Sequence, residues 1–150
     1  MTTATDIAGF LAKFTPQVAA QLRASRRKVR ALVPRGYELV FDNYNALVFG
    51  FSPTPKNSEA VLSLAVYPSW VTLFFLWGRT LSDPHHLLEG SGKQVRSVRL
   101  ASPAQLDSAP VRALIRQALG AAPFATAPKL STVIKSVSAA QRPRRPSRAQ

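Results

Sequence analysis

Two adjacent histidines stand among carboxylates in one short polar segment. His85 and His86 are flanked by Asp83 and Glu89. Imidazole nitrogens and carboxylate oxygens can together hold a divalent metal ion if a turn brings them to one point. Side chains of adjacent residues usually diverge, however, and none of the usual ligand spacings, such as two histidines separated by three residues, occurs here. We therefore expect a solvated loop, with a metal site as the alternative.

The same segment also contains the elements of a hydrolytic site. Asp83 and His85 could polarise the hydroxyl group of Ser82 or Ser91. A serine nucleophile needs to be presented to the substrate, for example on a sharp turn between a strand and a helix, and the sequence predicts no such turn. We expect no enzymatic activity, no catalytic residues and no cofactor.

Residues 90–93, with the sequence Gly-Ser-Gly-Lys, resemble part of a phosphate-binding loop. The spacing differs from that motif, because Leu87 stands where the first glycine is needed and Gln94 replaces the Ser or Thr that would meet magnesium. The pattern favours a hairpin turn. Weak anion contact remains the alternative, through the cations Lys93, Arg96 and Arg99.

Positive charge is the strongest physical signal in the chain. It has 20 lysines and arginines against 7 acidic residues, which gives a formal net charge of +13. Such a field attracts phosphates and anionic lipids whatever the fold, but no recognised motif for reading DNA or RNA accompanies it. The candidate polyanion-binding residues are Arg23, Arg26, Arg27, Lys28, Arg30, Lys93, Arg96, Arg142, Arg144, Arg145 and Arg148.

Four aromatic residues, Tyr44, Trp70, Phe74 and Trp77, follow or interrupt runs with strand propensity. Aromatic side chains exposed beside a sheet often line a groove that receives a small molecule or a segment of a partner protein. These four are the candidate ligand groove. The alternative is that they belong to the hydrophobic core.

Length and composition limit the architecture. A chain of 150 residues with 46% hydrophobic residues can build one ordinary core. The absence of cysteine excludes disulfides, thiolate metal sites and cysteine nucleophiles. Residues 1–9 carry no lysine or arginine and precede no long apolar run, which argues against a cleaved secretory signal, so we expect a cytoplasmic protein.

One uncharged stretch, Ala60 to Trp77, is about long enough to cross a bilayer as a helix. Pro68 and Ser69 divide it into two halves rich in Val, Phe, Trp and Tyr, which favour strands. We therefore predict a buried β-hairpin and no membrane span.

The remaining periodicities predict two helices around several strands. A helix capped by Thr15 runs until Pro34 and Gly36 stop it, and a second, capped by Asp107 or Ser108, ends near Gly120. The predicted strands are Tyr37 to Phe41, Ala46 to Phe51, Ala60 to Tyr67, Trp70 to Trp77 and Gln94 to Leu100.

This order predicts a two-layer α+β fold in which N- and C-terminal helices pack on an antiparallel sheet. We assign the domain to residues 1–120. Residues 121–150 are rich in Pro, Ala and Arg, contain no acidic residue, and are predicted to form a largely disordered basic tail. Within this tail, Thr132, Val133, Ile134 and Val137 could add one further strand.

Several sequence patterns resemble those of the YdhG-like domain family. These are Val-Pro-Arg-Gly-Tyr at 33–37, Ala-Val-Tyr-Pro at 65–68, Gly-Ser-Gly-Lys at 90–93 followed by Arg96, and Val-Arg-Ala-Leu-Ile at 111–115. The family consists of small bacterial α+β proteins of unknown function, some of them compared with frataxin-type iron chaperones. Iron binding of that kind relies on clustered carboxylates, whereas the acidic residues here are scattered: Asp6, Glu38, Asp42, Glu59, Asp83, Glu89 and Asp107.

Three functions remain open at this point. The first is a non-catalytic module that binds a small molecule or a protein. The second is weak, non-specific binding of nucleic acid, which would depend steeply on salt. The third is a frataxin-like metal chaperone, which follows from the resemblance alone. A homodimer is compatible with the apolar strand faces.

Overall fold

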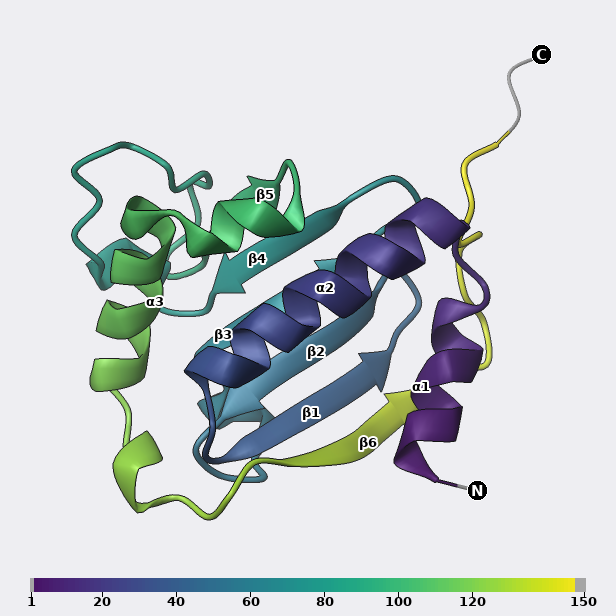
Figure 1. Ribbon diagram of the computed structural model, residues 1–150, viewed down its shortest axis with the longest axis horizontal. Helices are drawn as coiled ribbons and strands as arrows, with labels where there is room; N and C mark the ends of the chain where they lie inside the picture. Colours follow the sequence, from purple (N-terminus) through teal and green to yellow (C-terminus); the bar gives the residue numbers. More distant parts are fainter. Residues whose placement is uncertain (1, 148–150) are drawn as a thin grey trace.

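The computed structural model describes residues 2–147, in which helices and one sheet form an α+β fold (Figure 1). Its helices are α1 (Thr3–Leu11), α2 (Pro16–Leu32) and α3 (Ala109–Gly120). Its strands are β1 (Tyr37–Asp42), β2 (Leu47–Ser52), β3 (Leu62–Val66), β4 (Val71–Phe75), β5 (Arg96–Leu100) and β6 (Ser131–Val137). Four short 3-10 helices lie between them: η1 (Asn57–Glu59), η2 (Gly78–Thr80), η3 (Pro103–Asp107) and η4 (Phe124–Thr126).

Helix α2 begins as the sequence predicts. The Thr15 hydroxyl accepts a hydrogen bond from the backbone N–H of Val18 at 3.3 Å, and Pro16 occupies the first turn, where its missing N–H is harmless. Val18, Leu22 and Val29 recur at helical spacing and are buried. Figure 1 shows α2 lying across the sheet, so this apolar stripe packs on the strands.

The six strands form one sheet in the order β5-β4-β3-β2-β1-β6. Neighbours from β5 to β1 are antiparallel, whereas β6 pairs with β1 in parallel. One row of cross-strand partners runs through the centre of the core: Val40, Phe49, Leu64, Leu73 and Val98. All five are buried in the hydrophobic core, so this is the face of the sheet against which the helices pack.

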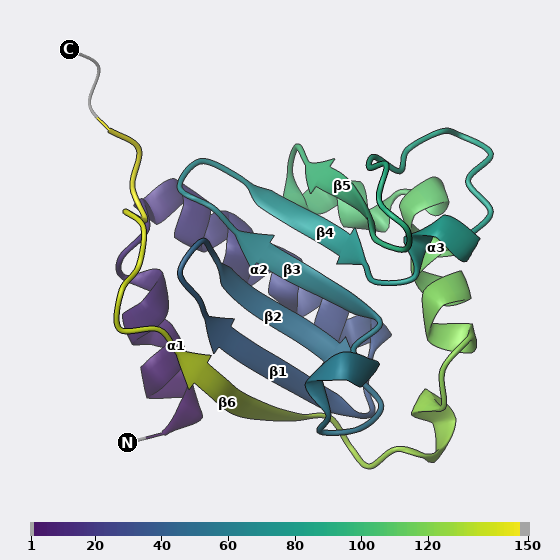
Figure 2. The same cartoon turned by 180° about the vertical axis from the view of Figure 1, so that it is seen from behind.

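No α-helix covers the other face of the sheet, where only the short turn η1 lies in front of the ends of β1 and β2 (Figure 2). Its rows pair Gly50 with Ser63 and Ala65 with Thr72. These small side chains are nevertheless buried, with Ser63 at 7%, Ala65 at 3% and Thr72 at 6% exposed. Larger side chains share this face, since Phe74 pairs with Ser63 and the Phe41 ring lies close to Gly50.

The uncharged stretch from Ala60 to Trp77 folds as the β3–β4 hairpin, which confirms the prediction. No helix within residues 2–147 has the length and apolar character needed to span a membrane.

Two parts of the predicted architecture need correction. The sheet is mixed rather than antiparallel, because β6 joins the free edge of β1 in parallel. Residues 121–147 are not a disordered tail, since they contain η4 (Phe124–Thr126) and β6, so the folded unit extends beyond residue 120. The physical reason is that the tail finds acidic partners elsewhere: the Thr132 hydroxyl donates to Glu38 at 2.8 Å, and Arg144 pairs with Asp42.

Two of the helices, α1 and α3, differ from the prediction. Helix α1 was not predicted. Only Ile7 and Leu11 are buried along its nine residues, and two buried positions are too few to identify an amphipathic helix from the sequence. Helix α3 has no side-chain cap. The Ser108 hydroxyl donates instead to the Gln105 carbonyl at 2.8 Å, and Asp107 binds Lys28.

Candidate ligand cavity

A cavity of about 430 Å³ lies between the end of β4 and the end of α3. Its size falls within the range of about 300–1,000 Å³ that is usual for small-molecule sites. The lining comes from the β2–β3 loop, β4 with the turn after it, and the end of α3. It comprises Pro53, Ser58, Glu59, Val61, Phe75, Trp77, Thr80, Leu81, Ala118, Ala121, Ala122 and Pro123.

The inner wall of this cavity is part of the hydrophobic core. Phe75 is fully buried, while Val61 and Ala118 are each 8% exposed. The alanines at the end of α3, Ala118, Ala121 and Ala122, leave space that larger side chains would fill. The cavity is therefore an apolar recess that is continuous with the core.

Trp77 forms the rim. It lies two residues after the end of β4, and its side chain is 50% exposed, which is unusual for a residue of this size and apolar character. The turn η2 (Gly78–Thr80) holds the chain in place, since the Thr80 hydroxyl donates to the Trp77 carbonyl at 2.8 Å. The indole ring thus stands at the mouth of an apolar recess.

A close approach of two backbones fixes this turn. A Cβ atom on Gly78 would lie 2.5 Å from the Cβ of Arg96 and 2.9 Å from its backbone nitrogen. Only glycine leaves room for β5 here. The position of Trp77 and Thr80 therefore depends on a glycine outside the cavity lining.

Glu59 supplies the charged group of the lining. One of its oxygens accepts a hydrogen bond from the Thr54 hydroxyl at 3.2 Å, and the other lies 4.0 Å from the Lys56 amine. Its side chain is 42% exposed. The described lining also has two hydroxyl-bearing residues, Ser58 and Thr80. Together with Glu59, these hydroxyl groups can form hydrogen bonds with a bound molecule.

Of the four aromatic residues of the predicted groove, only Trp77 lines this cavity. Trp70 lies at the opposite end of β4, where it stacks on Tyr67 and lies 4.0 Å below the guanidinium of Arg99. Phe74 belongs to the open sheet face, where it pairs with Ser63 and Ser97. Tyr44 lies in the β1–β2 turn, with Arg142 at 5.9 Å. A strand of this length separates its ends by roughly 20 Å, which explains why the groove does not form.

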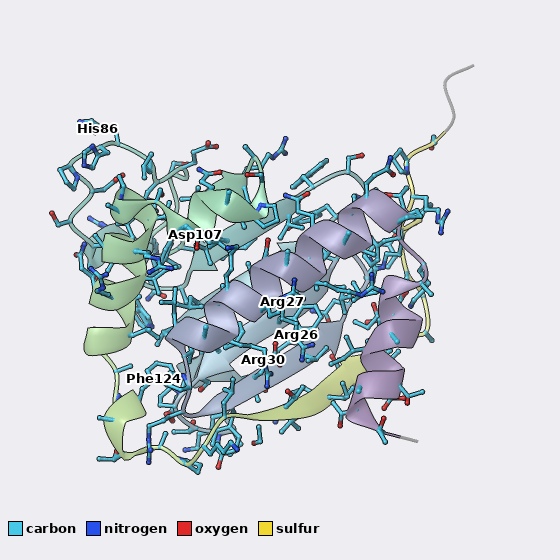
Figure 3. The ribbon with its side chains drawn as sticks, in the orientation of Figure 1. Arg26, Arg27, Arg30, His86, Asp107 and Phe124 are labelled. Carbon is cyan, nitrogen blue, oxygen red and sulfur yellow. The ribbon has the colours of Figure 1, made fainter. Side chains whose placement is uncertain are left out.

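Several cations of the predicted polyanion site are held by carboxylates. Arg26 binds the buried Glu38 through two nitrogens, each at 2.8 Å, and Arg30 binds it as well. Figure 3 shows both arginines extending from α2 toward β1 and β6. Lys28 lies 2.6 Å from Asp107, and its hydrogen bond lowers the pKa of Asp107 below the ordinary value of 3.8. These cations are not available as a continuous phosphate-binding surface.

The arginines of the tail are also engaged. Arg144 is buried against Asp42, Arg145 donates to the carbonyls of Ala12 and Lys13, and Arg142 lies over Tyr44. The carbonyls that Arg145 contacts are those at the end of α1, where a cation is favoured by the helix dipole. The predicted candidate Arg148 lies outside the described residues.

The loop cations and the glycine turn lie on the other side of the molecule from α1. Glu89 and Ser97 form an antiparallel bridge with backbone bonds of 2.8 and 2.9 Å, so residues 90–93 lie within a hairpin-like loop, as predicted. Arg96 donates to the carbonyls of Gly92 and Val95 within this loop, while Lys93 is exposed.

The four predicted metal ligands do not form a cluster. Within residues 2–147, no three side chains of the types His, Cys, Asp or Glu are arranged to hold a metal ion. The carboxylate of Asp83 instead accepts hydrogen bonds from the backbone N–H groups of Leu87 and Leu88, each at 2.9 Å. It therefore shapes the loop in which His85, His86 and Glu89 stand, and Figure 3 shows His86 on the outer part of that loop.

Sequence reasoning found Trp77 but missed the rest of the cavity. In the sequence, Val61 and Phe75 lie in predicted strands and carry no signal that distinguishes them from other buried strand residues. The signal that could have pointed to the site is the group of small residues at the end of α3, Ala118, Gly120, Ala121 and Ala122, followed by Pro123, because small side chains on the face turned toward β4 leave a recess.

Comparisons with known proteins gave no relative: no family model, no curated protein and no solved structure matches this chain. The resemblance to the YdhG-like family stays a prediction.

Proposed function

We propose that this protein is a non-catalytic binding module whose cavity beside Trp77 takes a small, largely apolar molecule. The observation that carries the proposal is an apolar recess of about 430 Å³, lined by Val61, Phe75 and Ala118 and open to solvent beside a half-exposed tryptophan. An apolar ligand placed there would remove both the recess and the indole from water.

The polar groups suggest how the ligand would be oriented. Glu59 and Thr80 stand on the same lining as Val61 and Phe75. A few polar groups in an otherwise apolar pocket fix the orientation of a ligand. We expect a ligand with one hydrogen-bond donor at the end that faces Glu59.

The test uses N-phenyl-1-naphthylamine, a neutral apolar fluorophore with a single N–H donor, so that the high net charge of the protein does not drive binding. In a Trp70→Phe background, Trp77 is the remaining tryptophan. We expect energy transfer from Trp77 to the bound probe and saturable probe emission.

A matched pair of substitutions locates the probe. Ala121→Phe fills the cavity from an exposed position, and Ala20→Phe adds the same side chain to an exposed position of α2 outside the cavity. We expect Ala121→Phe to abolish energy transfer and Ala20→Phe to leave it unchanged. Saturable binding that survives Ala121→Phe, or no probe binding at all, would contradict the proposal.

A further inference from the structure

Helices α1 and α2 enclose a second cleft of about 330 Å³, distinct from the cavity beside Trp77. The α2 wall consists of Arg23, Arg26, Arg27 and Arg30, and the α1 wall of Ala4, Ile7, Ala8 and Leu11. The arginines follow the i, i+3, i+4, i+7 spacing that places side chains on one face of a helix. One wall is therefore cationic and the opposite wall apolar.

The positive charge of this cleft is only partly neutralised. Glu38 is fully buried on β1 and binds Arg26 and Arg30, so one carboxylate serves two guanidinium groups. Arg23 and Arg27 are exposed and form no ion pair within residues 2–147. Four guanidinium groups and one carboxylate leave an excess of positive charge in a confined space.

The internal carboxylate also orders the cationic wall. The two nitrogens of Arg26 are fixed by Glu38, and Arg30 is fixed by Glu38 and by the Thr132 hydroxyl at 3.1 Å. Figure 3 shows Arg26, Arg27 and Arg30 along the same stretch of α2. Two guanidinium groups are thus held in place and the neighbouring Arg23 and Arg27 keep their charge for a ligand. Guanidinium groups bind phosphate oxygens in a fixed fork geometry.

The apolar wall distinguishes this cleft from a simple basic patch. Ile7 and Leu11 are at most 5% exposed and form the inner part of the wall, whereas Ala4 and Ala8 are exposed at its outer part. A polymer of phosphates would contact the arginines but would gain nothing from a wall of alanine, isoleucine and leucine. An anion that carries its own hydrocarbon chain would contact both walls.

We propose that the α1–α2 cleft binds a small amphiphilic anion, specifically an alkyl phosphate monoester. Its phosphate lies against Arg23 and Arg27, and its chain lies along Ala4, Ala8 and the inner Ile7 and Leu11. Binding is non-covalent, and it does not depend on the function proposed for the cavity beside Trp77.

The test is calorimetric titration of the full-length protein with octyl phosphate below its micelle concentration. Arg23→Gln/Arg27→Gln removes two exposed charges from the cleft. Arg116→Gln/Lys129→Gln removes two exposed charges outside it and therefore gives the same net charge. We expect the cleft variant to bind at least about tenfold more weakly, because a charge-assisted hydrogen bond contributes about 1.5–3 kcal/mol, and the control variant to change by less than about threefold.

Two further ligands test the role of each wall. Octyl glucoside has the same chain without the charge, and inorganic phosphate has the charge without the chain. We expect both to bind more weakly than octyl phosphate. Ala8→Glu, which places a carboxylate on the exposed part of the apolar wall, is expected to abolish binding while keeping the fold.

The proposal is overturned by any of three results. If Arg23→Gln/Arg27→Gln and the control Arg116→Gln/Lys129→Gln weakened octyl phosphate binding equally, the overall positive charge of the protein, and not the cleft, would attract the anion. Equal affinity for inorganic phosphate and octyl phosphate would mean that the apolar wall contributes nothing. Binding of a single-stranded oligonucleotide that is lost in Arg23→Gln/Arg27→Gln, without binding of octyl phosphate, would favour a polyanion site. Ala121→Phe should leave octyl phosphate binding unchanged, which separates this result from the test of the other cavity.

Discussion

Arg144 and Asp42 form a buried ion pair, with 2.9 Å between the Nη2 and Oδ1 atoms, although they are 102 residues apart in the sequence. The side chains are 3% and 0% exposed. The second carboxylate oxygen of Asp42 lies 2.6 Å from the Lys13 amine, and the Arg144 guanidinium also lies over the Phe14 ring at 5.7 Å. One carboxylate at the end of β1 therefore joins the C-terminal segment to the corner between α1 and α2.

Asp42→Ala should destabilise the protein by about 3–5 kcal/mol, because it leaves the buried guanidinium of Arg144 without its charge partner. The measurement is the free energy of unfolding from urea denaturation. As a control, Arg145→Ala removes an exposed neighbour that contacts only backbone carbonyls, and we expect a change of about 0.5 kcal/mol or less. Equal effects from the two substitutions would show that burial of the pair adds nothing to stability.

The same pair predicts a loss of stability in acid. Burial alone would raise the pKa of Asp42, but hydrogen bonds from Lys13 and Arg144 outweigh burial and hold the pKa below its ordinary value of 3.8. A carboxyl group whose pKa is lower in the folded state stabilises the fold above the unfolded pKa, and this contribution disappears as the pH falls through the folded pKa.

We therefore expect the difference in unfolding free energy between the wild type and Asp42→Asn to shrink as the pH is lowered from about 5 to about 2. Urea denaturation at each pH gives this difference. Asp6→Asn removes a carboxylate that forms no ion pair within residues 2–147 and is the control. A difference for Asp42→Asn that stays constant over this range would contradict the predicted linkage.

The point at which the chain is shortened should decide whether it folds. A chain that ends at Ala122 lacks η4 and β6, exposes the edge of β1 and leaves Glu38 without the Thr132 hydroxyl. We expect it to aggregate or to lose its cooperative thermal transition, because an unpaired strand edge and a partly unsatisfied buried carboxylate both destabilise the fold.

A chain that ends at Ser138 keeps β6 but lacks Arg144 and should fold with a lower melting temperature. Circular dichroism melting of the two shortened chains and the full chain makes the comparison. If the chain ending at Ala122 melted cooperatively at the temperature of the full chain, residues 123–147 would not contribute to the fold.

The elements that could be predicted from the sequence are those identified by residues close together in the chain. The cap at Thr15 and the apolar spacing of Val18, Leu22 and Val29 identify α2 without any knowledge of what it packs against. The two hairpins follow in the same way, because strand propensity and turn residues are neighbours in the chain. For these elements the local and tertiary preferences agree.

What could not be predicted depends on partners far away in the sequence. A run of arginines and prolines has the composition of a disordered tail, and only the presence of Asp42 beside the end of β6 makes Arg144 a buried residue. The parallel pairing of β6 depends in the same way on the free edge of β1. The two cavities depend on the spacing between elements, such as the end of α3 and β4, which no single segment of sequence encodes.

Gly78→Ala should both destabilise the fold and disturb the cavity beside Trp77. The added Cβ would lie 2.5 Å from the Cβ of Arg96 and 2.9 Å from its backbone nitrogen, so η2 and β5 must move apart. Overpacking of this kind costs about 1–3 kcal/mol.

Gly92→Ala is the matched control, since a Cβ there meets no atom within 4 Å. We expect Gly78→Ala to weaken binding of N-phenyl-1-naphthylamine and to shift the emission of Trp77, as measured in the Trp70→Phe background, whereas Gly92→Ala changes neither. If Gly78→Ala left stability and the Trp77 spectrum unchanged, the close approach of η2 to β5 would not control the position of the indole, and the shape of the cavity would depend on its other walls, the β2–β3 loop, β4 and the end of α3.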